Sequence, residues 1–322
     1  MKKEEDLPFA SALEALFTRD PLPIHLLHRL SDMTAEEMAT FQAGWTAVPT
    51  PRRRIIIRHL TDLTEDNYVV DFGPVFRDCL HDPDEQVRVA ALDGMWDVTD
   101  MRLISPIVQL MQHDPVEDVR VAAAAALGHF VMLVEWGQLP ERFAPPLITA
   151  LLAEYENQET PLPLRRATLE ALGAASHPRI AHLIDAAYES GDEELQISAV
   201  FAMGASADKR WLTTVLGEMD SPDPEMRAEA ARASGQLGSS DAVTHLERLV
   251  ADEDIEVQLA AIVALGRIGG DMAHNLLLRL ADEEEDSGLL EAVDEALEEL
   301  SLFAGEFKFL DYDEEEEEEG NP

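Results

Sequence analysis

Apolar residues recur along most of the chain at helical spacing, and one such run repeats at a nearly constant interval. In residues 119–128, apolar or small side chains stand at offsets 0, 4, 7 and 8 from Val119, which places them on one face of a helix. We call Val119 an anchor position; the equivalent anchors are Val87, Leu164, Leu195, Met226 and Val257. The steps between successive anchors are 32, 45, 31, 31 and 31 residues. A period near 31 predicts a repeat array.

Small side chains dominate the rows four and seven residues after each anchor. The row nine residues after the anchor holds Trp96 and then five glycines: Gly128, Gly173, Gly204, Gly235 and Gly266. We expect the small rows to let neighbouring helices approach closely, and the glycines to end or bend each helix.

A turn rich in Asp and Pro precedes most anchors, as in HDPDEQV from residue 81 and HDPVEDV from residue 113. Asp accepts hydrogen bonds from the free N–H groups at a helix start, and Pro fits the first helical turn. Upstream of these turns lie further apolar-periodic runs, for example residues 104–111, 242–250 and 273–281. Each repeat is therefore predicted to be a helical hairpin. The expected fold is all-α, with about seven or eight hairpins.

The row directly after the anchor is mostly arginine: Arg88, Arg120, Arg165, Gln196, Arg227 and Gln258. An Asp-Pro turn, then Val-Arg, then Ala-Ala-x-x-Ala-Leu-Gly resembles the HEAT repeat, in particular the short type also found in phycobilisome lyases. The resemblance covers about residues 70–300 and implies an α-α superhelix, or solenoid. It also implies a ladder of Asp–Arg hydrogen bonds between stacked repeats. The residues that would belong to this ladder are Asp82, Asp84, Arg88, Asp114, Arg120, Arg165, Asp223 and Arg227.

Three parts are expected along the chain. Residues 1–50 hold short apolar runs without the repeat signature, which is typical of an N-terminal helical cap. Residues 51–302 form the array, with an insertion around 129–163 where the step lengthens to 45 residues. Residues 303–322 combine aromatic residues with six consecutive glutamates and are expected to be disordered. This tail either folds back onto the last repeat or serves as a docking peptide.

The net charge of −41 is unevenly distributed. Residues 281–322 contain 19 acidic residues and one lysine, a net charge of −18. Such a field repels nucleic acid and anionic membranes and favours cationic partners, although it also serves solubility. No apolar stretch is long enough to span a bilayer, and acidic residues occupy the place of a signal peptide's apolar segment. A cytoplasmic location is therefore expected.

Two features leave alternatives open. Arg52, Arg53 and Arg54 form a basic cluster that either pairs with neighbouring acids or holds an anionic group of a partner. The insertion either adds packing or forms part of a binding face.

No catalytic residues, metal site or cofactor are predicted. Deoxyhypusine hydroxylases are HEAT proteins whose iron site uses His-Glu dipeptides, and none of the ten histidines here precedes Glu. His81 and His113 are one repeat apart but lack further ligands. The single Cys79 excludes an intramolecular disulfide and is expected to be a buried apolar residue. A bilin-lyase-like enzyme or tetrapyrrole-binding protein is the alternative function that the resemblance offers.

We therefore predict a non-enzymatic interaction scaffold. In HEAT proteins the second helix of each hairpin lines the concave side, so the rows two and six residues after the anchors are expected to bind a partner. The candidate residues, with Trp96 added, are Val89, Trp96, Val121, Arg166, Ile197, Phe201, Leu259 and Val263. The expected partner is a protein with a basic segment, and the oligomeric state stays open.

Overall fold

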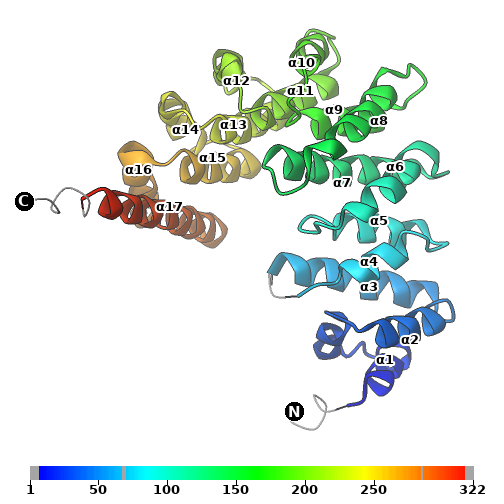
Figure 1. The fold of residues 1–322 in the computed structure, drawn as a ribbon. Coiled ribbons are helices and arrows are strands. Elements are labelled where there is room, and N and C mark those ends of the chain that lie inside the picture. The colour runs from blue at the N-terminus through cyan, green and yellow to red at the C-terminus, as the bar shows by residue number, and fades with distance from the viewer. Residues whose placement is uncertain (1–6, 67–69, 284–285, 316–322) are drawn as a thin grey trace, which may run out of the picture. The chain divides into compact units, whose positions relative to one another are not determined.

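The structure is a computed structural model that describes residues 7–66, 70–283 and 286–315. Of residues 65–66, 283 and 303–315 only the backbone is described. Within the described ranges the regular elements are helices, without a strand (Figure 1). This confirms the predicted all-α repeat class. The chain forms two compact units, residues 1–172 and 173–322, and each unit is considered by itself.

The first unit begins with short helices and continues with three helix pairs. Its opening helices are α1 (Phe9–Thr18), η1 (Ile24–Leu30), α2 (Ala35–Trp45) and α3 (Thr50–Asp66). The pairs are α4 (Gly73–Cys79) with α5 (Glu85–Asp93), α6 (Ile104–His113) with α7 (Glu117–Glu135), and α8 (Ala144–Glu156) with α9 (Leu162–Leu172). Single 3-10 turns, η2 (Met101–Leu103) and η3 (Glu141–Phe143), lead into α6 and α8.

The second unit consists of four helix pairs. They are α10 (Ile180–Tyr188) with α11 (Glu193–Ala205), α12 (Leu212–Glu218) with α13 (Pro224–Leu237), α14 (Val243–Leu249) with α15 (Ile255–Ile268), and α16 (Gly270–Glu283) with α17 (Ser287–Glu315). The 3-10 turns η4 (Lys209–Trp211) and η5 (Ser240–Ala242) lead into α12 and α14. The described residues thus form seven pairs in the two units together, within the predicted range.

The second helices of the pairs stack on one another within each unit (Figure 1). In the first unit α3, α5, α7 and α9 pack in this order, and in the second unit α11, α13, α15 and α17 do so. The anchor side chains and the small rows after them are buried in these contacts. Each helix pair therefore buries an apolar face that only its neighbours can cover.

The glycine row serves close packing. Gly173 directly follows the last residue of α9, but the other four glycines lie inside their helices, so the expectation that the row ends the helices was wrong at those positions. Gly128 lies in the middle of α7, and Gly235 lies inside α13. A Cβ added at Gly235 would lie 2.9 Å from the Cα of Ala264 on α15. The glycine therefore permits an approach between two helix backbones that no larger residue allows.

The long step between anchors comes from α7, which has 19 residues, and from α8, which has 13 residues where α12 and α14 have seven. The added turns of α7 bury Phe130, Val131, Leu133 and Val134. Trp136, which follows the last residue of α7, is 68% exposed. The insertion therefore adds packing on one side and an exposed aromatic side chain on the other.

Candidate functional site

Two acidic rows in the turns have separate structural roles. The row three residues before the anchors caps the following helix at the four positions where it holds Asp; before Val119 and Leu164 it holds Val116 and Pro161. The side chains of Asp84, Asp192, Asp223 and Asp254 accept hydrogen bonds from backbone N–H groups at the starts of α5, α11, α13 and α15. Asp223 was expected to join the ladder; its carboxylate caps α13, and the side chain of Arg227 donates to Asp252.

The row five residues before the anchor accepts hydrogen bonds from an arginine of the preceding repeat where it holds Asp, at Asp82, Asp114 and Asp252. Arg88 Nη2 donates to Asp114 Oδ1 at 2.9 Å. Arg227 holds Asp252 through two parallel bonds, Nε to Oδ2 at 2.8 Å and Nη2 to Oδ1 at 2.7 Å. Both arginines also donate to a backbone carbonyl in their own turn, Arg88 to Asp82 and Arg227 to Ser221. Each arginine therefore joins its own turn to the next one.

Arg53 belongs to the same pattern, which the sequence reasoning missed. Its side chain is 7% exposed and lies against Asp82, whose side chain is 2% exposed. Arg53 Nη2 donates to Asp82 Oδ1 at 3.1 Å, and Trp45 Nε1 donates to Asp82 Oδ2 at 2.8 Å. The sequence contains evidence for this equivalence. Ile56 and Leu60 stand four and eight residues after Arg52, which makes Arg52 the anchor position and Arg53 the residue directly after it.

The neighbouring arginines of this cluster are also engaged within the protein. Arg54 Nε donates to Asp84 Oδ1 at 2.8 Å, and Arg52 Nε donates to the carbonyl of Leu16 at 2.8 Å. These contacts favour the pairing interpretation of the basic cluster over an anion-binding one.

The pattern changes in the middle of the chain. Arg120 Nη2 donates to Glu154 Oε1 at 2.6 Å, a residue of α8 that the turn signature does not identify. Arg165 Nη2 donates to backbone carbonyls of its own turn, including that of Thr160 at 3.4 Å. Gln196 and Gln258 likewise donate to carbonyls of their own turns.

Two of the ion pairs perturb the pKa values of their members. The hydrogen bond from Arg227 lowers the pKa of Asp252, and the hydrogen bond from Arg54 lowers the pKa of Asp84. The two carboxylates in turn raise the pKa of Arg227 and of Arg54. Both carboxylates are therefore ionised at neutral pH and remain so in moderate acid.

The predicted partner-binding residues differ in exposure. Ile197 is only 7% exposed. Val263 is 37% exposed. The other six are half-buried: Val89, Trp96, Val121, Arg166, Phe201 and Leu259. The rows thus lie partly under neighbouring helices, because small residues bring the second helices close together.

Helix α15 presents an apolar stripe on this face. Ile255, Leu259 and Val263 lie four residues apart along it, and we call them the α15 stripe. Ile255 is 48% exposed. Among the described residues of α5, α7, α9, α11, α13 and α15, the large apolar side chains that are exposed are Ile255 and Val263 of this stripe.

Glycine contacts fix the register of α15 with its neighbours. Gly235 of α13 faces Ala264, and a Cβ on Gly266 of α15 would lie 3.1 Å from the Cα of Ala296 on α17. Gly235 stands nine residues after its anchor and Ala264 seven residues after its own, so neighbouring second helices are shifted along their axes by about two residues. On α17, which packs against α15, Glu291 and Glu295 are exposed.

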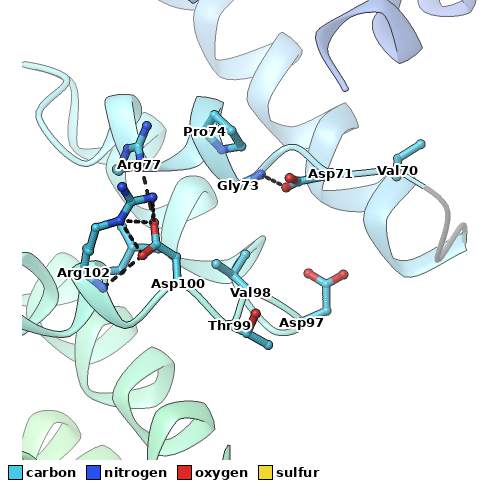
Figure 2. Close-up of a pocket in the computed structure, with 11 residues that line it drawn as sticks. Val70, Asp71, Gly73, Pro74, Arg77, Asp97, Val98, Thr99, Asp100 and Arg102 are labelled. Carbon is cyan, nitrogen blue, oxygen red and sulfur yellow. Dashed lines mark hydrogen bonds and ion pairs between the residues drawn. The ribbon is translucent and has the colours of Figure 1, made fainter. Parts of the chain in front are cut away.

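A separate pocket of about 460 Å³ lies in the first unit between the start of α4 and the segment that leads into α6. Figure 2 shows Arg102 and Arg77 around Asp100, while Asp71 accepts the backbone N–H of Gly73 at 2.9 Å. Burial raises the pKa of Asp97 on the other side of the pocket. Both arginines of the lining already hold Asp100, so this pocket is poorly suited to an anionic ligand.

Metal-ligating side chains do not gather in the described part of the chain. No group of three or more His, Cys, Asp or Glu residues there is arranged to hold a metal ion. His81 and His113 line one pocket, but the neighbouring Asp114 is engaged by Arg88. Cys79 is buried, and burial raises the pKa of its thiol. No described helix is long and apolar enough to cross a membrane.

The family model for HEAT repeats matches residues 73–157, 180–254 and 212–298. The chain therefore belongs to the HEAT-repeat family, as its sequence pattern predicts. Among curated proteins, none matches the sequence.

Three solved structures are similar to the chain at low identity. Human deoxyhypusine hydroxylase is 18% identical, covers 91% of this chain and 96% of its own, and gives a TM-score of 0.38. The CpcE–CpcF complex of phycocyanin lyase from Nostoc sp. PCC7120 is 17% identical over 71% and 94%, with a TM-score of 0.46. Importin beta is 14% identical over 90% and 46%, with a TM-score of 0.45. At these values the likenesses carry no inference about function.

Proposed function

We propose that this protein is a non-enzymatic interaction scaffold that binds a segment of another protein on the exposed face of its second helices. The α15 stripe is the observation that carries the proposal. A soluble helix normally turns its large apolar side chains toward the core, and contiguous exposed ones indicate an interaction surface.

The acidic charge supports a partner with basic residues. Glutamates flank the stripe on α17, and the net charge of residues 281–322 is −18, from 19 acidic residues and one lysine. Long-range attraction of this kind accelerates association more than it strengthens the final complex. The proposed division of the chain keeps residues 1–50 as a cap, 51–302 as the array and 303–322 as an acidic extension. The structure gives α17 through Glu315, and residues 316–322 lie outside the described part.

Affinity capture from the native source tests the proposal, with the wild-type protein compared with Ile255→Asp/Val263→Asp. Both positions are exposed, so the variant is expected to fold, and its circular dichroism and thermal midpoint should match the wild type. Partners that bind through the face should disappear with the variant and weaken at high salt. A set of captured proteins that is unchanged by the variant would exclude this face. Visible absorption of the purified protein would instead indicate a bound tetrapyrrole.

A further inference from the structure

We infer that the face centred on α15 takes an amphipathic helix of a partner protein, with its basic flank toward α17. This inference rests on the proposed function and specifies the partner's structure, charge and orientation. It follows from two parallel stripes of opposite character, the apolar α15 stripe and an acidic stripe formed by Glu291 and Glu295.

The α15 stripe has the dimensions of a helix-binding surface. Its residues are spaced at i, i+4 and i+8, so it runs along the α15 axis for about 12 Å, eight residues at 1.5 Å each. A helix that lies along this line presents apolar side chains at the same spacing, which is the pattern of helix-in-groove recognition. An extended segment turns alternate side chains away from the surface and matches a continuous stripe less well.

The neighbouring helix supplies the charge that selects the partner. Glu291 and Glu295 are exposed and precede Ala296, the α17 residue that faces Gly266, by five residues and by one. Leu259 and Val263 precede Ala264, which faces Gly235, by the same intervals, so the two pairs lie on corresponding faces of α17 and α15. Packed helices lie about 8–10 Å apart, so the acidic stripe runs beside the apolar one at roughly the diameter of a partner helix. Basic residues on one flank of that helix then face the two glutamates while its apolar stripe covers α15.

The other flank of α15 carries an arginine. Arg232 on α13 lies 3.3 Å from Glu229 and 4.0 Å from Glu256. A partner helix rotated to turn its basic flank toward α13 would meet this arginine between its two glutamates, whereas the α17 flank offers the exposed Glu291 and Glu295. The α17 flank is therefore the better position for the partner's basic residues.

Fluorescence anisotropy with three labelled helical peptides tests the inference on the full-length protein. The first peptide carries leucines at helical spacing on one stripe and lysines along one flank. In the second peptide glutamates replace the lysines, and in the third serines replace the leucines. We expect the first peptide to bind about tenfold more tightly than either of the others at low salt.

Charge reversal on the protein provides the decisive comparison. Glu291→Lys/Glu295→Lys should weaken the lysine peptide about tenfold and make the glutamate peptide the preferred ligand. The matched control is Asp185→Lys/Glu189→Lys, which reverses two exposed acids at the same i, i+4 spacing on α10, a first helix. It changes the net charge equally, so it measures the non-specific part of the attraction. Ile255→Asp/Val263→Asp should weaken the lysine peptide at least tenfold.

Three results would overturn the inference. They are no binding of the lysine peptide up to about 1 mM, equal affinity for the lysine and glutamate peptides, and equal effects of the α17 and α10 reversals. If partners are still captured through the α15 stripe, such results refute only the claim that the partner segment is a basic amphipathic helix, and the proposed function is retained. Loss of both binding activities would refute the two proposals together.

Discussion

Substitution of Arg53 by Ala should destabilise the protein more than the same substitution at Arg120 or Arg102. The change leaves the carboxylate of Asp82, with a side chain that is 2% exposed, without its charged partner. It also removes the donor to the carbonyl of Val48, a bond of 2.6 Å. Breaking a buried ion pair from one side costs about 3–5 kcal/mol. Because Asp82 retains the N–H groups of Trp45 and Asp84, we expect about 3 kcal/mol.

Alanine substitutions at two other arginines, Arg120 and Arg102, provide comparisons for the loss of unfolding free energy at Arg53. Arg120→Ala removes a donor from Glu154, but Thr160 Oγ1 still donates to that carboxylate at 2.8 Å. The expected loss is therefore about 1–3 kcal/mol. Arg102 is 77% exposed and pairs locally with Asp100, so Arg102→Ala should cost less than about 1 kcal/mol.

Urea unfolding followed by circular dichroism at pH 7 gives the three free energies of unfolding. The reasoning predicts the order Arg53, Arg120, Arg102, from the largest loss to the smallest. The double variant Arg53→Met/Asp82→Asn should lose less than the sum of its single variants, since no buried charge is left alone. A loss at Arg53 no larger than that at Arg102, or strict additivity of the double variant, would refute the buried pair.

Three other predictions concern packing, pH and charge. Gly235→Ala should cost about 1–3 kcal/mol of unfolding free energy, because the added Cβ meets the α15 backbone. The control Gly217→Ala places its Cβ where no atom lies within 4 Å, so thermal unfolding should show it to be neutral or stabilising. Equal effects of the two substitutions would contradict the close approach of α13 and α15. The lowered pKa of Asp252 contributes stability that is present above the ordinary Asp pKa of about 3.9 and is lost as pH falls through the folded-state value. Asp252→Asn should therefore lose less stability on acidification than the wild type, as measured by urea midpoints at several pH values, and an identical acid dependence would count against the Arg227 pair. Deletion of residues 311–322 should slow association with a captured partner and make the association rate less dependent on salt, while the dissociation rate changes little. An unchanged association rate in stopped-flow measurements would show that the tail serves only the solubility of the protein.

Much of the fold follows from the sequence because each repeat carries the same buried rows. The anchors, the small rows and the capping Asp residues are local signals, and local signals place helices well. The role of the glycines was not evident, since a glycine that permits close contact and one that ends a helix look alike without the neighbouring helix. Only the position of Ala264 beside Gly235 separates the two roles.

The site was less accessible to sequence reasoning, for two physical reasons. Arg53 lacks the Asp-Pro turn in front of it, so its equivalence to Arg88 depends on the spacing of Ile56 and Leu60 alone. The burial of Ile197 depends on how closely the neighbouring helices approach, and the spacing of residues in the sequence does not give the distance between helices. For the same reason the sequence named Val263 and Leu259 but did not identify the stripe that they form with Ile255.

Site-specific photo-crosslinking tests the central claim most directly. A photoreactive amino acid replaces Val263 on the α15 stripe in one protein and Asp185 on α10 in another, and each protein is irradiated in extract of its native source. The account predicts a discrete protein adduct at position 263 that is absent at position 185 and is abolished by Ile255→Asp. Equal adducts at both positions, or an adduct at 185 alone, would contradict binding on the face of the second helices.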